Sequence, residues 1–195
     1  MIDIERQKKN FINHVATFQD LGYIKILDFQ NPGHSEYRIR FLFEEDHYRL
    51  HISGDLGELI AYNFTNMRYE TFGDFVNNPE YFEKKICCHE RSIYEYDEDK
   101  ARKEIKEMFE QYEIILPDRY FIGADDDAEA FEDFLNDVLE DFDDDKGISQ
   151  EGYRVLSEAD TDAWEYAAHI GRERTGIIEL YLLAFRLAQE DLKRQ

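Results

Sequence analysis

The chain has 195 residues, and 43% hydrophobic content with 15% aromatic residues is enough for a packed core. Its formal net charge of −22 excludes ordinary binding to nucleic acid or to anionic membranes, because both attract Lys and Arg. No segment approaches the roughly 20 apolar residues of a membrane span, and the N-terminus lacks the order of a secretory signal. We therefore expect a cytoplasmic protein with a basic partner.

The first part of the chain predicts one helix followed by antiparallel strands. Residues 4–21 place apolar side chains at helical spacing before Gly22, which predicts an amphipathic helix with a glycine stop. The apolar period then changes to two in YIKILDF, EYRIRFLF, HYRLHIS and ELIAYNF, which are separated by short turn segments. These four segments predict an antiparallel meander.

The segments that follow predict helices with one further strand. NPEYFEKKICC predicts a short helix with proline in its first turn, RSIYEYD a strand, and DEDKARKEIKEMFEQY a helix opened by acidic residues. Beyond Leu116 and Pro117 the pattern is helical throughout, and the predicted helices span residues 128–142, 160–169 and 175–191.

The charge changes at about the same place. Residues 1–120 hold 24 acidic and 16 basic side chains, a net of −8, whereas residues 121–195 hold 21 and 7, a net of −14. The predicted fold class is therefore α+β. Residues 1–120 form a domain with an antiparallel sheet and packed helices, and residues 121–195 form an acidic, all-helical subdomain.

The last predicted helix, TGIIELYLLAFRLAQEDL, is apolar around most of its circumference and must be buried. Burial within the monomer is the simplest expectation, and a homodimer seam is the alternative. Cys87 and Cys88 are the only cysteines, and adjacent cysteines without further ligands indicate reduced thiols. Because the chain also lacks a glycine-rich phosphate loop, zinc spacing and a nucleophile elbow, we expect no cofactor, no metal and no enzyme.

The most unusual stretch is the acidic segment, residues 125–145, which carries twelve carboxylates and no Lys or Arg. One interpretation is a disordered acidic tail, because blocks of like charge repel. A continuous helical stripe argues against it: Phe131, Phe134, Leu135, Val138, Leu139 and Phe142. We predict a helix whose carboxylates bind a partner: Asp125, Asp126, Asp127, Glu129, Glu132, Asp133, Asp137, Glu140, Asp141, Asp143, Asp144 and Asp145.

A second interpretation of the acidic segment is a calcium loop. Asp141, Asp143 and Asp145 have EF-hand spacing, and apolar helices flank them. However, Lys146 stands where the turn needs glycine, and Gly152 stands where the bidentate glutamate belongs. Both required residues are displaced by one position, so this EF-hand-like loop is degenerate and no metal site is predicted.

A third interpretation is mimicry of a nucleic-acid backbone. As one helix, 21 residues would span roughly 30 Å and carry one charge per about 2.6 Å. Duplex DNA carries one charge per about 1.7 Å of its axis, and a single strand one per about 3.4 Å. Such a surface would compete for a groove lined with Lys and Arg. The simplest alternative is a solvated acidic face.

A local basic patch offers an enzymatic alternative. If the HYRLHIS strand buries its apolar residues, His47, Arg49 and His51 share the outward face with Ser53. Arg38 and Arg40 point outward from the preceding strand. Paired histidines beside arginines suit general acid–base cleavage of RNA, but two histidines at strand spacing are a weak signal, and a solvated or salt-bridged sheet face is the simpler explanation.

The segments HISGDLGELIAYNF, NPEYFEKK and YEYDEDKARKEI carry a resemblance that covers roughly residues 37 to 110. The sequence resembles small acidic proteins of phages and mobile elements in Gram-positive bacteria, in which an ISGDLG strand-turn precedes a Y-F-x-x-K helix. Here residues 53–57 form the turn, and Tyr81, Phe82 and Lys84 lie on the helix. The family includes anti-CRISPR inhibitors of type II nucleases, which implies defence evasion in the host bacterial cytoplasm. The acidic segment lies outside the matched region.

The resemblance and the charge together predict an anti-CRISPR protein. It would inhibit an RNA-guided DNA nuclease by presenting a nucleic-acid-mimicking acidic surface to the basic DNA-binding region. The expected partner is a type II CRISPR effector nuclease with its guide RNA, and we expect no direct binding to free DNA. The alternatives are a nuclease-like enzyme acting on guide RNA through His47 and His51, and an acidic interaction module of a mobile element without inhibitor activity.

Overall fold

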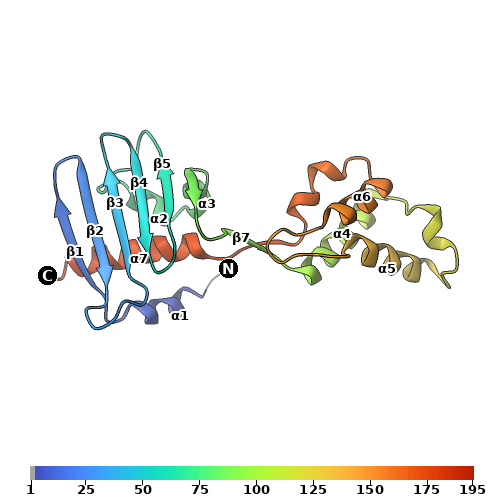
Figure 1. Ribbon diagram of the computed structural model, residues 1–195, viewed down its shortest axis with the longest axis horizontal. Helices are drawn as coiled ribbons and strands as arrows, with labels where there is room; N and C mark the ends of the chain where they lie inside the picture. The colour runs from blue at the N-terminus through green and yellow to red at the C-terminus, as the bar shows by residue number, and fades with distance from the viewer. Residues whose placement is uncertain (1–2) are drawn as a thin grey trace. The chain divides into compact units, whose positions relative to one another are not determined.

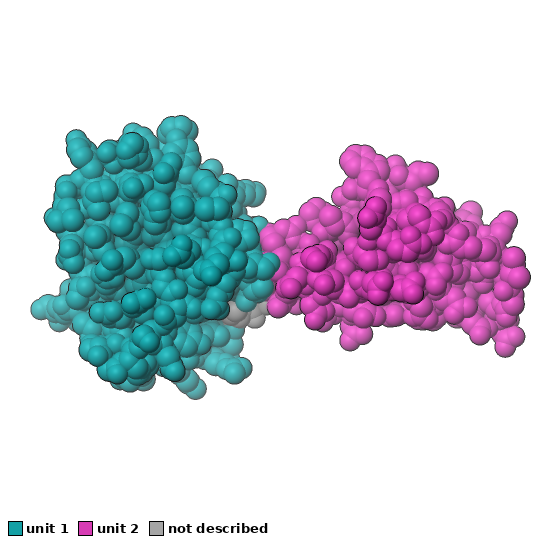
Figure 2. All heavy atoms as spheres, in the orientation of Figure 1, with its two compact units in different colours: residues 1–93, 175–195 teal, residues 94–174 magenta. Residues whose placement is uncertain are grey.

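The computed structural model describes residues 3–195 and divides the chain into two compact units (Figures 1 and 2). Unit 1 comprises Met1–Ile93 together with Thr175–Gln195, and unit 2 comprises Tyr94–Arg174. Unit 2 is therefore inserted into the chain of unit 1, whose first and last segments fold together. The segments that enter and leave unit 2 pair as antiparallel strands, β7 (Tyr94–Tyr96) and β8 (Arg172–Arg174).

This division differs from the predicted boundary at residue 120. Helix α4 (Glu98–Tyr112) belongs to unit 2, whereas α7 (Ile177–Leu192) belongs to unit 1. Residues 121–195 therefore do not form one helical body. The change in charge along the chain misplaced the boundary, because long-range packing rather than local composition decides which helices fold together.

Unit 1 is built on a six-stranded sheet, which confirms the α+β class with an antiparallel sheet and packed helices. The strand order follows the chain from β1 to β6, and every neighbouring pair is antiparallel. The predicted meander corresponds to the four central strands, and one further strand is added at each edge. The strands are β1 (Val15–Asp20), β2 (Ile24–Gln30), β3 (Ile39–Glu44), β4 (Arg49–Gly54), β5 (Leu59–Tyr62) and β6 (Ile86–His89).

The predicted helix over residues 4–21 is wrong beyond its first turns. The chain forms α1 (Ile4–Lys8) and the short 3-10 helix η1 (Lys9–Phe11), and then becomes strand β1. In β1, Ala16 is buried and Phe18 stacks on Tyr69 at a ring distance of 4.3 Å, so alternate residues face the core. Ile12 of the expected apolar stripe is 79% exposed. The same apolar residues fit both periods, and pairing with β2 selected the strand.

Helix α7 covers one face of the sheet together with α2 (Gly73–Val76) and α3 (Pro79–Glu83) (Figure 1). Phe185 of α7 lies at the centre of an aromatic core. Its ring centroid is 5.4 Å from that of Phe41, 6.1 Å from Phe43 and 4.8 Å from Phe72. Seven side chains of α7 are buried. The apolar circumference that allowed a homodimer seam is thus covered within unit 1.

The ISGDLG segment forms the turn between β4 and β5, and its contacts are structural. Gly54 has a φ of 145°, and a Cβ atom there would lie 1.9 Å from the carbonyl oxygen of Arg38, so only glycine fits. The Asp55 amide donates to the same carbonyl at 3.0 Å. The hydroxyl of Tyr181 on α7 donates to the carbonyl of Leu56 at 2.7 Å. The motif therefore joins the sheet to the last helix.

Unit 2 is mainly helical, with a core of its own around Phe109, Phe134 and Leu156. The helix predicted over 128–142 ends at Val138, and the one predicted over 160–169 is two short 3-10 turns. The helix after Ser149 was expected only as the second flank of the EF-hand-like loop, and its bounds were not predicted. The elements after α4 are η2 (Asp118–Phe121), α5 (Asp127–Val138), α6 (Gln150–Ala159), η3 (Ala163–Glu165) and η4 (Ala167–His169).

Two further sequence expectations concern membranes and thiols. Among the helices of residues 3–195, none is both long enough and apolar enough to span a bilayer. Cys87 and Cys88 lie on β6, and both are exposed and not joined in a disulfide.

Candidate functional site

Most of the negative charge of the protein lies on unit 2. Its 81 residues carry 27 acidic and 9 basic side chains, a net formal charge of −18. Unit 1 carries 18 acidic and 14 basic side chains, a net charge of only −4. The separation is sharper than the one predicted at residue 120, because residues 94–120, with a net charge of −4, join unit 2, whereas residues 175–195, whose charges balance, leave it.

All twelve predicted carboxylates of the acidic segment are exposed, and they lie on three consecutive pieces of chain. Asp125 and Asp126 precede α5, and five others lie on α5 itself. The remaining five follow the helix, in the turn that leads to α6. The structure therefore brings all twelve onto the surface of one unit, although not onto one helix.

Helix α5 is ordered by its cap and by its apolar face. The Oδ1 atom of Asp126 accepts hydrogen bonds from the amides of Ala128 at 3.0 Å and Glu129 at 2.9 Å, which is a side-chain N-cap. On the opposite side Phe134 and Leu135 are fully buried. The predicted stripe is thus the core-facing side of the segment, as far as Val138 on α5 and beyond it at Leu139 and Phe142, and the Asp126 side chain is engaged as the helix cap.

The helix is shorter than the prediction over residues 128–142, and much shorter than the 21 residues over which the charge spacing was compared. Its 12 residues rise about 18 Å. They carry five carboxylates, or one per about 3.6 Å, which is close to the spacing of about 3.4 Å along one nucleic-acid strand. The helix ends at Val138 with Leu139 as its C-cap, and Asp141 beyond it adopts a left-handed conformation with a φ of 57° in the turn toward α6. The comparison with duplex DNA over 21 helical residues is therefore wrong.

Five of the twelve carboxylates have partners within unit 2. Glu132 pairs with Arg102 at 3.2 Å, and Asp137 accepts a hydrogen bond from the Tyr120 hydroxyl at 2.8 Å. Asp126, Glu129 and Asp143 accept from nearby amides. Among residues 3–195, no hydrogen bond or ion pair engages the other seven side chains: Asp125, Asp127, Asp133, Glu140, Asp141, Asp144 and Asp145.

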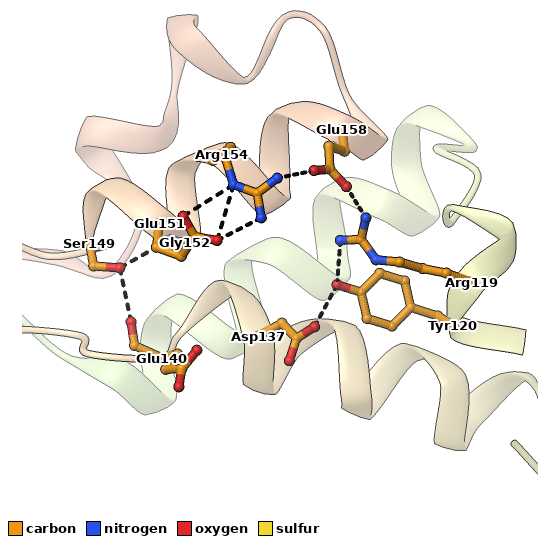
Figure 3. A network of polar contacts seen from close by, with 9 residues as sticks. All are labelled: Arg119, Tyr120, Asp137, Glu140, Ser149, Glu151, Gly152, Arg154 and Glu158. Atoms are coloured by element: carbon orange, nitrogen blue, oxygen red, sulfur yellow. Dashed lines mark hydrogen bonds and ion pairs between the residues drawn. The ribbon is translucent and has the colours of Figure 1, made fainter. Parts of the chain in front are cut away.

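A polar network on the same unit engages two of its nine basic side chains in ion pairs (Figure 3). Arg154 of α6 pairs with Glu151 at 2.6 Å and with Glu158, and Arg119 of η2 pairs with Glu158 and donates to Tyr120 at 2.9 Å. Hydrogen bonding, first to Tyr120 and then to Glu158, raises the pKa of Arg119. Both cations are therefore committed to the scaffold, and neither offsets the seven free carboxylates.

The turn after α5 is built by hydrogen bonds between backbone groups. The amide of Gly147 donates to the carbonyl of Asp143 at 2.7 Å, and the reverse bond measures 3.1 Å. Gly152 lies on α6, where a Cβ atom would be 1.9 Å from the carbonyl of Val138, so the glutamate of a calcium loop cannot stand there. Within the described part of the chain, no group of three or more His, Cys, Asp and Glu side chains is placed to hold a metal ion.

The outward sheet face does not organise the two histidines as a pair. His51 on β4 lies 3.1 Å from Glu44, whereas His47 lies in the preceding turn, 3.7 Å from Asp46. Arg40 makes two hydrogen bonds to Asp28, at 2.7 and 2.9 Å. This arrangement favours a salt-bridged sheet face over a pair of histidines that cleaves RNA.

A polar hollow does lie on that face, but neither histidine lines it. It has a volume of about 340 Å³ and brings together three residues of the predicted patch, Arg38, Arg40 and Ser53. Asp28 and Glu58 line it as well, so the arginines meet carboxylates there. The hollow is therefore close to electrically balanced, unlike the surface of unit 2.

The sequence interpretation missed the exposed apolar residues of unit 2. Ile115 is 80% exposed and Phe121 is 43% exposed, on the segments between α4 and α5. A signal was present in the apolar run that ends at Pro117 and in the aromatic pair that follows it, but both read as helix boundaries or core.

No protein-family model matches the chain, and neither the curated proteins nor the solved structures include a significant match.

Proposed function

We propose that the protein is an anti-CRISPR inhibitor that presents the acidic surface of unit 2 to the basic, nucleic-acid-binding region of an RNA-guided nuclease. One observation carries the proposal: unit 2 has a net charge of −18, and seven exposed carboxylates of its acidic segment have no partner in the described chain. Carboxylates without internal partners are available to Lys and Arg of another protein.

The physical basis is competition for a positive groove. Basic channels that hold nucleic acid gain affinity by releasing counterions, and an acidic protein surface exploits the same effect. Because the N-cap and core of α5 already order the charges, binding does not require the segment to fold first. The protein would act stoichiometrically, with no catalytic residue.

The ISGDLG resemblance supports the choice of partner. Guide-loaded type II nucleases hold their nucleic acids in positively charged channels, which are complementary to unit 2. The motif itself lies in unit 1 and is explained by the turn it forms, so we assign the inhibitory contacts to unit 2. In this proposal, unit 1 is the scaffold into whose chain the acidic unit 2 is inserted.

The test compares two variants with equal total charge. In the first, four free carboxylates of unit 2 are converted to amides: Asp125, Asp127, Asp144 and Asp145. In the matched control, four exposed carboxylates of unit 1 are converted: Glu36, Asp46, Asp74 and Glu190. Inhibition of DNA cleavage by a guide-loaded type II nuclease is titrated with each variant at two salt concentrations.

We expect the unit 2 variant to inhibit at least about tenfold more weakly, and the unit 1 control to match the unmodified protein. Higher salt should weaken inhibition by the unmodified protein more than inhibition by the unit 2 variant. Equal potency of the two variants would overturn the acidic-surface mechanism. Binding to the nuclease without inhibition would instead indicate an interaction module.

A further inference from the structure

An apolar groove opens on the surface of the acidic unit. It has a volume of about 490 Å³ and lies between the end of α4, residues 114–116, η2 and the first half of α5. Most of its exposed lining is apolar. The apolar lining residues are Phe109, Ile114, Ile115, Leu116, Phe121, Ala128 and Phe131.

The shape of the groove is held by the core beneath it. The rings of Phe109 and Phe131 meet edge to face at 5.5 Å and form part of the lining. Glu113 ends α4 in a left-handed conformation with a φ of 52°, and the amide of Ile114 donates back to the carbonyl of Phe109 at 3.1 Å. This turn keeps Ile115 80% exposed at the groove instead of folding it into the core.

The rim of the groove carries mostly carboxylates. Glu110 and Asp127 line it without a hydrogen-bond or ion-pair partner in the described chain, and Glu132 lines it while paired with Arg102. Lys106 is the single basic residue of the lining. A large apolar side chain that enters this groove would therefore be surrounded by negative charge.

We propose that the groove binds the apolar face of a basic, amphipathic helix of the partner protein, with Lys and Arg of that helix directed at the rim carboxylates. Complementary charge around an apolar centre is the usual anatomy of a helix-binding groove. The inference rests on the proposed function and deepens it, because nucleic-acid mimicry by charge alone would need no apolar contact.

Other occupants fit the groove less well. A second copy of this chain would bring another unit of charge −18 toward the same rim, and like charges would repel. Nucleic acid and anionic membranes are repelled for the same reason. The groove therefore selects a protein segment that is both basic and apolar.

The test uses two synthetic peptides of equal length and equal positive charge as probes. The first is an amphipathic helix with Leu on one face and Lys on the other, and in the second every Leu is replaced by Ser. Binding to the full-length protein is measured by fluorescence anisotropy. The Ile115→Ser variant is compared with Ile122→Ser, which changes a side chain that is 83% exposed but does not line the groove.

We expect the amphipathic peptide to bind at least about tenfold more tightly than the Ser peptide. Ile115→Ser should weaken binding of the amphipathic peptide by about tenfold and leave the Ser peptide unchanged. Ile122→Ser should change neither affinity. Because both positions are exposed, both variants should keep the circular dichroism spectrum of the unmodified protein.

Two outcomes would overturn the proposal that the groove binds the helix. One is unchanged affinity of the Ile115→Ser variant for the amphipathic peptide, and the other is an equal loss of affinity in the Ile122→Ser variant. A variant in which Asp125, Asp144 and Asp145 are converted to amides separates this result from the proposed function, because none of these three residues lines the groove. If it loses affinity for both peptides while Ile115→Ser loses none, the acidic surface stands and the groove fails. If only Ile115→Ser loses affinity, the groove stands and the acidic-surface function fails.

Discussion

The two units of this protein differ in how far their acidic and basic side chains balance. In unit 1 the acidic and basic side chains are nearly balanced and often paired. Lys25, for example, forms ion pairs with Asp20, Glu45 and Glu70, and hydrogen bonding to Glu70 raises the pKa of Lys25. Unit 2 has three acidic side chains for every basic one, 27 against 9.

The difference shows that the excess charge has no role in holding unit 2 together. Its helices are ordered by an apolar core, by N-caps and by a few ion pairs, and most carboxylates of the acidic segment remain outside these contacts. Uncompensated like charges oppose folding, so their accumulation on one unit points to a use outside the chain. Four predictions test how far the units differ.

The largest expected effect comes from adding one methyl group to either unit. Gly54→Ala and Gly152→Ala each place a Cβ atom 1.9 Å from a carbonyl oxygen, so each should lower the free energy of unfolding by about 3 kcal/mol or more. Trp164, the only tryptophan, lies in unit 2 and reports on it by fluorescence during chemical denaturation. We expect Gly152→Ala to shift that transition and Gly54→Ala to leave it in place.

Gly73→Ala is the control for this pair, because a Cβ atom there meets nothing within 4 Å and φ is not positive. It should change stability by less than about 1 kcal/mol. If Gly54→Ala shifts the Trp164 transition as much as Gly152→Ala does, the two units unfold as one and the comparison between them loses its basis.

The second prediction concerns salt. Raising the ionic strength screens repulsion among like charges, so it should stabilise unit 2, with its net charge of −18, by about 1 kcal/mol. Unit 1 should respond much less, because its charges are paired. The measurement follows Trp164 fluorescence for unit 2 and amide hydrogen exchange of the β2–β4 strands for unit 1. An equal response of both units would contradict the separation of charge.

Removing one hydroxyl in each unit should give a moderate loss of stability in unit 1 and a smaller loss in unit 2. Tyr181→Phe leaves the buried carbonyl of Leu56 without its donor and should cost about 1–2 kcal/mol. Tyr120→Phe should cost less, about 0.5–1 kcal/mol, because water can solvate the exposed Asp137 in place of the lost bond. Denaturant titrations of both variants measure the two costs, and a larger loss for Tyr120→Phe would contradict this ranking.

The fourth prediction concerns the ionisation of the Tyr181 hydroxyl of unit 1 at alkaline pH. Burial raises the pKa of Tyr181 to about 12 from an ordinary value of 10.0. A raised pKa means that its stabilising contribution is complete below pH 10 and is lost as pH rises toward 12. We expect unit 1 of the unmodified protein to lose more stability over this interval than unit 1 of the Tyr181→Phe variant, as measured by hydrogen exchange.

Sequence patterns predicted the parts of this protein that depend on neighbouring residues. The alternation in β2–β5, the capped helix α4 and the apolar stripe of α5 are local signals, and the structure confirms them. The exposure of all twelve carboxylates also followed from the sequence, since charged side chains opposite an apolar stripe face water. The partner and the inhibitory activity remain predictions.

Only the tertiary structure decided what depends on distant residues. The edge strand β1 reads equally well as a helix until β2 pairs with it, and α7 joins unit 1 because Phe185 completes a core made by residues more than a hundred positions earlier. The end of α5 near Asp141, and the groove that leaves Ile115 exposed, likewise arise from packing between helices. Local periodicity specifies which face of an element is apolar, whereas the contacts that bury that face are set by the whole fold.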